Sequence, residues 1–153
     1  LMLRRPRNPN QPILTRPLLL RIGLVTLIML AGAFGLFLLE SRILNAELAM
    51  ARTVALNVIV VVEAAYLLSC RSLSNSMFQL GVFSNRWIFF GIGSMAVAQM
   101  LVTHLPAANR IFHTSPIGLG EWSRILLVGA VTYLAVEAEK LFRRRQLIRS
   151  HKP

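Results

Sequence analysis

Residues 54 to 68 read VALNVIVVVEAAYLL, an apolar run with a single acidic residue, Glu63, near its middle. With its flanks, the run is long enough to cross a bilayer as a helix, which needs about 20 mostly apolar residues. A carboxylate at that depth costs roughly 2–3 kcal/mol, and acids that persist there usually mark an ion path or a binding site. The stretch therefore predicts a membrane-spanning helix that presents Glu63 as a ligand for a cation or a proton.

The composition of the whole chain is typical of a membrane protein. Hydrophobic residues make up 55% of the chain, the mean hydropathy is +0.59 and only 15% of residues are charged, against about 25% in soluble domains. The 17 basic residues outnumber the 6 acidic ones, but they gather at the ends of apolar segments and are not interleaved with aromatic residues as in single-strand binding grooves. We therefore expect lipid, and not nucleic acid, as the partner of the basic residues.

Four apolar segments predict the fold class, an all-α membrane protein built as a bundle of four transmembrane helices. The expected spans cover residues 17–39, 51–69, 87–105 and 122–139. The weakest is the fourth, because its apolar core covers only 125–136. The remaining domain boundaries are a cytoplasmic loop rich in Pro and Arg at 1–16, the transmembrane domain at 17–142 and a basic cytoplasmic tail at 143–153.

The distribution of basic residues predicts the orientation. With four spans, both termini lie on one side, and 13 of the 17 Lys and Arg residues fall on that side. Cytoplasmic loops carry such an excess of basic residues. We therefore expect a multi-pass protein of the plasma membrane with both termini in the cytoplasm.

Several other polar and small residues suggest helix contacts. Asn57 lies about 240° around the helix from Glu63, at 100° per residue, so we expect it to bond a neighbouring helix instead of sharing Glu63's face. Arg21 is expected to extend toward the interface, and Glu139 to pair with Arg143 at i,i+4. Small-residue faces suited to close helix packing are formed by Ala31 with Gly35, and by Gly91, Ser94 and Ala98.

Motifs along almost the whole chain, residues 3 to 146, resemble the seventh to tenth transmembrane helices of type II cation-transporting P-type ATPases. They match in order and in spacing: RPRNPNQPILT (5–15), EAAYLLSCRS (63–72), GVFSNRW (81–87) and LGEW (119–122) followed by an apolar run that ends at Glu137. Glu63 matches the glutamate that donates an oxygen ligand to calcium in the sarcoplasmic-reticulum pump. The resemblance implies the C-terminal transmembrane part of an ATP-driven cation pump, which braces the ion-binding helices and contributes one carboxylate.

The departures from the family pattern limit what this chain does alone. Tyr66 and Ser69 stand where the family often has asparagines, and Ala138 replaces an acid beside Glu137. The phosphorylated aspartate and the nucleotide domain are not in this chain, which has no Asp at all. We therefore expect no catalytic residue and no cofactor here, with ATP and Mg²⁺ used elsewhere in the pump and the pump's other helices and cytoplasmic domains as partners.

The transported ion and two other functions stay open. Calcium is favoured, because the outer loop at about 40–50 is short for the accessory subunit that sodium pumps bind, but the sequence leaves the ion open. One alternative is a stand-alone four-helix membrane protein, a regulator or the product of a truncated gene, without transport activity of its own. Another is a small channel or proton carrier assembled around Glu63.

Overall fold

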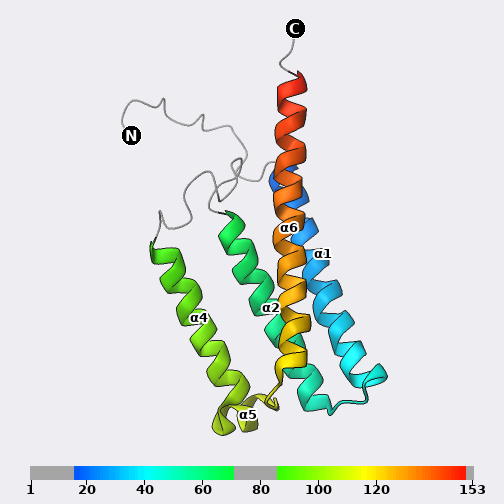
Figure 1. Ribbon diagram of the computed structural model, residues 1–153, viewed down its shortest axis with the longest axis vertical. Helices are drawn as coiled ribbons and strands as arrows, with labels where there is room; N and C mark the ends of the chain where they lie inside the picture. Colours follow the sequence, from blue (N-terminus) through cyan, green and yellow to red (C-terminus); the bar gives the residue numbers. More distant parts are fainter. Residues whose placement is uncertain (1–15, 71–85, 151–153) are drawn as a thin grey trace.

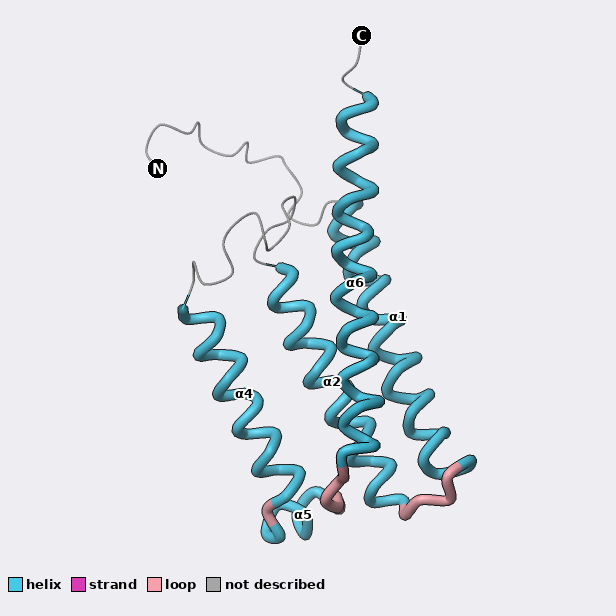
Figure 2. Tube along the Cα trace, viewed as in Figure 1, coloured by secondary structure: helices cyan, strands magenta, loops and turns pink. Residues whose placement is uncertain are grey.

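A computed structural model describes residues 16–70 and 86–150 of the chain, so nearly all of the predicted loop at 1–16 and the end of the tail lie outside the described residues. The described part is helical and contains no strand (Figure 2). Its elements are α1 (Arg16–Leu38), a π-helical turn η1 (Leu39–Ile43), α2 (Leu48–Cys70), α4 (Arg86–His104), α5 (Pro106–Phe112) and α6 (Leu119–Ser150).

The four long helices run alternately up and down, so that the start of α1 and the end of α6 lie at the same end of the bundle (Figure 1). Helix α2 is central, because it packs against α1, α4 and α6, whereas the main contacts of α4 are with α2 and α5. Each predicted span coincides with one long helix to within a few residues, except that α6 continues to Ser150, through most of the predicted tail.

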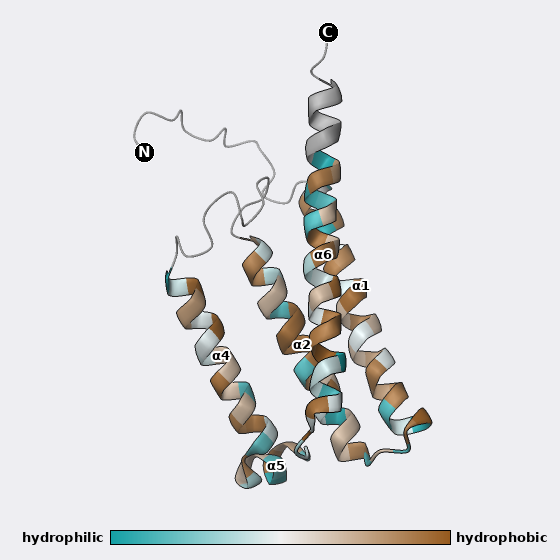
Figure 3. Ribbon diagram, in the orientation of Figure 1, coloured by the Kyte–Doolittle hydropathy of each residue, from teal (hydrophilic) through white to brown (hydrophobic). Residues whose placement is uncertain are grey.

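Three of the long helices are long and apolar enough to cross a membrane: Leu18–Ile43, Leu48–Cys70 and Arg86–His104. Figure 3 shows apolar residues along these helices and hydrophilic residues near the ends of the bundle and on the upper part of α6. Helix α6 is not among the three, because charged residues lie near its start and through its second half. The all-helical membrane fold is thus confirmed, while the fourth span stays a prediction.

The conformation of the connection between α4 and α6 is determined at its start by Pro106. Leu105 adopts the extended conformation (φ −78°, ψ 122°) that a residue before proline prefers. Helix α4 therefore ends at His104, and Pro106 starts α5, where its missing N–H group costs nothing. At the end of α5, His113 takes the left-handed conformation (φ 51°), and its N–H donates to the Asn109 carbonyl.

The core is a seam of β-branched side chains where α1, α2 and α6 meet, and it includes Val25, Val58 and Ile125. Two glycines let these helices approach closely. A Cβ atom at Gly32 would lie 2.6 Å from Val128 Cγ1, and one at Gly129 would lie 2.5 Å from Val61 Cγ1. A Cβ atom at Gly35 or Gly91 would meet nothing within 4 Å among the described residues, so the close approach uses different glycines from those expected.

The contact at Gly129 yields a stability prediction. Gly129→Ala should destabilise the chain by about 1–3 kcal/mol, because overpacking forces side chains or backbone to shift and the facing Val61 is held in one rotamer by its helix. Gly35→Ala, at an open position on α1, should be neutral or stabilising. Unfolding of both variants by SDS in detergent micelles, followed by far-UV circular dichroism, measures the difference, and equal midpoints would contradict this packing.

Candidate functional site

Glu63 lies on the uncovered face of α2. The buried residues of this helix, among them Val54, Val58 and Val62, form the side that packs on α1 and α6. Glu63 is exposed, and it shares a helical stripe with three other exposed residues, Arg52, Leu56 and Leu67. The structure thus places the carboxylate among apolar neighbours on a face of α2 that no other described helix covers, with Arg52 three turns away.

Within the described residues, Glu63 has no hydrogen bond and no ion pair to another side chain. A carboxyl group bonded to a neighbouring helix, another way to accommodate an acid within the membrane, therefore finds no support in this part of the chain. The described residues also contain no cluster of three or more His, Cys, Asp or Glu side chains that could hold a metal ion. Since Ca²⁺ takes six to eight oxygen ligands, Glu63 supplies at most part of a cation site.

Asn57 confirms its predicted role as a contact between helices. It is fully buried, and its Nδ2 donates to the Thr53 carbonyl at 2.8 Å and to Thr103 Oγ1 of α4 at 3.0 Å. Thr53 Oγ1 in turn accepts a hydrogen bond from the Ser115 N–H at 2.9 Å. These bonds hold α4 and the segment before α6 against the first half of α2.

A buried ion pair joins the beginning of α1 to the second half of α6. Arg21 is only 1% exposed, and its Nε and Nη2 donate to Glu139 Oε2 at 2.9 and 2.6 Å. The expected pair of Glu139 with Arg143 is confirmed at 3.7 Å. The expectation that Arg21 extends toward the interface stays a prediction, and the structure adds that α6 supplies a carboxylate beside it.

Lys140 fastens the end of α2 to α6. It is 3% exposed, and its Nζ donates to the Ser69 carbonyl at 2.6 Å and to Glu137 Oε1 at 2.7 Å. The last carbonyls of a helix lack partners within the helix, and a cation there also interacts favourably with the helix dipole. This contact therefore fixes the α2 end two turns beyond Glu63.

A second ionic group joins the opposite ends of α1 and α6. Arg124 donates to buried Glu40 Oε1 from Nε at 3.0 Å and from Nη2 at 2.6 Å, and Nη2 also donates to Glu121 Oε1 at 2.8 Å. The other oxygen of Glu121 accepts the Gly118 N–H at 2.7 Å and so caps the start of α6. Burial acts to raise the pKa of Glu121, but backbone hydrogen bonds and Arg124 outweigh it, so the pKa lies below its usual value.

The two ionic groups are spaced like the borders of a membrane. Arg21 on α1 and Glu40 on η1, the turn that continues α1, stand 19 residues apart, which is about 29 Å at 1.5 Å per residue. The hydrocarbon core of a bilayer is about 30 Å thick. Sequence reasoning missed both ion pairs, because the partners lie 118 and 84 residues apart in the sequence. The signal that could have found them was opposite charges at matching ends of the predicted spans.

Comparison with known proteins identifies the family of this chain. Residues 1–142 match the family described as "Cation transporting ATPase, C-terminus". The "Probable cation-transporting ATPase F" of Mycobacterium bovis is 46% identical over 144 residues, which cover 94% of this chain and 16% of that protein. The "Calcium-transporting ATPase 1" of Schizosaccharomyces pombe is 31% identical over 145 residues, which cover 95% of this chain and 16% of that protein.

A human protein is also similar to this chain. The "Calcium-transporting ATPase type 2C member 1" of Homo sapiens is 29% identical over 147 residues, which cover 95% of this chain and 16% of that protein. The chain thus spans about a sixth of the length of the curated relatives it matches.

The buried pair of Arg21 and Glu139 predicts a large stability effect. Glu139→Leu should destabilise the chain by about 3 kcal/mol or more, because it leaves the Arg21 charge buried without its carboxylate. The double variant with Arg21→Met should recover most of the loss, since both charges are then gone. Detergent unfolding measures both. Glu47→Leu, at an exposed acid, is the control, and an equal loss in it and in Glu139→Leu would exclude a specific role for the pair.

The lowered pKa of Glu121 predicts a pH dependence. Its contribution to stability is present above the ordinary carboxyl pKa, near 4.5, and is lost as the pH falls through the lower value in the folded state. Glu121→Gln should therefore cost about 0.5 kcal/mol at pH 7, as for other partly exposed ion pairs, and this difference from the parent chain should shrink as the pH falls below 4.5. Unfolding midpoints across this pH range test the prediction, and a constant difference would refute it.

Proposed function

This chain belongs to the family of C-terminal domains of cation-transporting P-type ATPases, and from that membership we propose that it braces the ion-binding helices of such a pump and lends Glu63 as one cation ligand. The exposed position of Glu63 on an apolar face of α2 carries the proposal. A carboxylate facing hydrocarbon is costly, so this face is best suited to contact with further helices that bring the remaining oxygen ligands.

Calcium is the ion that we propose. Relatives from fission yeast and from humans are named calcium-transporting ATPases, and a carboxylate oxygen is a ligand that Ca²⁺ prefers. The connection from η1 to α2 covers only residues 44–47, which leaves little protein on that side for an accessory subunit. ATP hydrolysis and Mg²⁺ binding then belong to other parts of the pump.

We also propose that α6 is the fourth span and that both termini of the chain lie in the cytoplasm. The apolar stretch 125–136 of α6 lies between two ionic groups, and Arg124, Glu137 and Lys140 at its ends all have charged partners. Such pairing lowers the cost of placing them at the membrane border. The start of α1 and the end of α6 share one side (Figure 1), which fits the excess of basic residues expected for a cytoplasmic face.

The ligand role predicts a specific loss of calcium affinity. In the pump that contains this chain, Glu63→Gln should raise the calcium concentration for half-maximal ATP hydrolysis about tenfold or more, because the number of charged ligands tunes calcium affinity over decades. Glu63→Gln keeps the shape of the side chain and so spares helix packing. Glu47→Gln, at an exposed acid outside the long helices, should leave the affinity unchanged. An unchanged affinity in Glu63→Gln would rule out the ligand role.

A further inference from the structure

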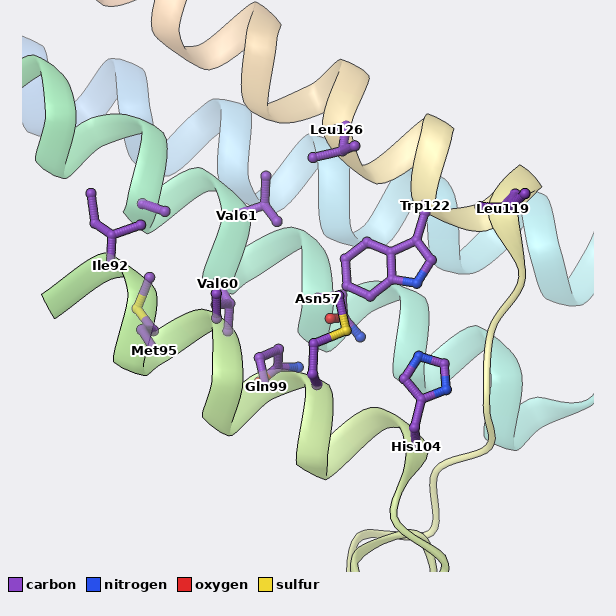
Figure 4. Close-up of a pocket in the computed structure, with 13 residues that line it drawn as sticks. Asn57, Val60, Val61, Ile92, Met95, Gln99, His104, Leu119, Trp122 and Leu126 are labelled. Carbon is purple, nitrogen blue, oxygen red and sulfur yellow. The ribbon is translucent and has the colours of Figure 1, made fainter. Parts of the chain in front are cut away.

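A cavity of about 530 Å³ lies between α2, α4 and α6, on the side of the bundle where α5 is found (Figure 4). Most of its lining is apolar, and it includes Val60 and Val61 of α2, Met95 of α4 and Leu126 of α6. Its volume falls within the range of about 300–1,000 Å³ that is typical of small-molecule sites. None of the ionic groups described above borders it.

Two polar side chains, His104 and Trp122, lie at one end of the cavity, while Gln99 of α4 and Asn57 of α2 line its middle. His104 is the last residue of α4 and Trp122 lies in the first turn of α6, and their side chains point toward one another across the α5 end (Figure 4). The far end is lined by Ile92 and other apolar side chains. An amphipathic indole and an imidazole at one end with hydrocarbon beyond is the arrangement found at a membrane–water interface.

The length of the cavity matches one leaflet of a bilayer. Its lining residues on α4 run from Ile92 to His104, which is about 18 Å of helix. Half of the hydrocarbon core is about 15 Å. Both α2 and α4 are candidate membrane spans, so a lipid chain lies within reach of the cavity, whereas water does not fill apolar cavities.

We propose that this cavity binds one acyl chain of a phospholipid from the leaflet on the α5 side, with the polar part of the lipid beside His104 and Trp122. A transmembrane helix is too large for the space, since a helix 10 Å wide and 18 Å long occupies about 1,400 Å³. The bond between Asn57 and Thr103 fixes the distance of α4 from α2 near the polar end, so the gap cannot simply widen. This site is independent of the proposed role of Glu63.

Fluorescence quenching tests the site on the full chain in detergent. The chain has two tryptophans, and Trp87→Phe leaves only Trp122, which lines the cavity. Titration with phosphatidylcholine that carries brominated acyl chains should quench Trp122 and saturate near one lipid per chain. Ala96→Phe, which fills the cavity from α4, should remove at least half of the saturable quenching. The matched control Ala98→Phe, at an exposed residue of the same helix outside the lining, should retain it.

Three results would overturn the proposal: quenching that rises with lipid without saturation, equal quenching in the Ala96 and Ala98 variants, or saturation by a brominated free fatty acid but not by the phospholipid. Circular dichroism establishes that each variant keeps its helices. If Ala96→Phe does not fold, Ala64→Leu fills the same cavity from α2, and its quenching decides in the same way.

Discussion

The requirement that every charge in or near hydrocarbon has a partner governs this bundle. Arg21, Glu40 and Lys140 are among its most buried polar side chains, and each is paired with an opposite charge on α6. Because one ionic group ties α1 to α6 at each end, the two helices cannot slide past one another without exposing a charge. Helix α2 packs against both of them, and its valine face completes the core that the ionic groups hold in register.

Glu63 is the exception to this rule, and the contrast bears on its function. The other described acids on the long helices and η1 all have basic partners, whereas Glu63 faces outward without one. A bundle selected only for stability would gain by an apolar residue at this position, as the cost of an intramembrane carboxylate is several times RT. The cost is understandable if the partner is a cation, which binds at a face completed by other helices of the pump.

The sequence was sufficient for the long helices, but not for the contacts between them. Apolar length predicted the four long segments, and helical periodicity correctly separated Asn57 from Glu63, because both depend on one helix alone. The pairs Arg21–Glu139 and Glu40–Arg124, and the close approaches at Gly32 and Gly129, depend on which helices adjoin and at what depth. A hydropathy pattern also does not include the partners of the charges on α6, which are Arg21 of α1, Glu40 of η1 and the Ser69 carbonyl of α2.

The orientation of Glu63 depends on contacts remote from it. Helix α2 is held near its start by Thr53 and Asn57, and near its end by the Lys140 bond to the Ser69 carbonyl. A shift of α2 by one residue in register would turn it by about 100° and bring Glu63 toward the valine core on α1 and α6. The polar contacts of Asn57 and Lys140 oppose such a turn from two different sides. The uncovered face of α2 is therefore a consequence of how its other faces are bonded, including the bond from Lys140 on another helix.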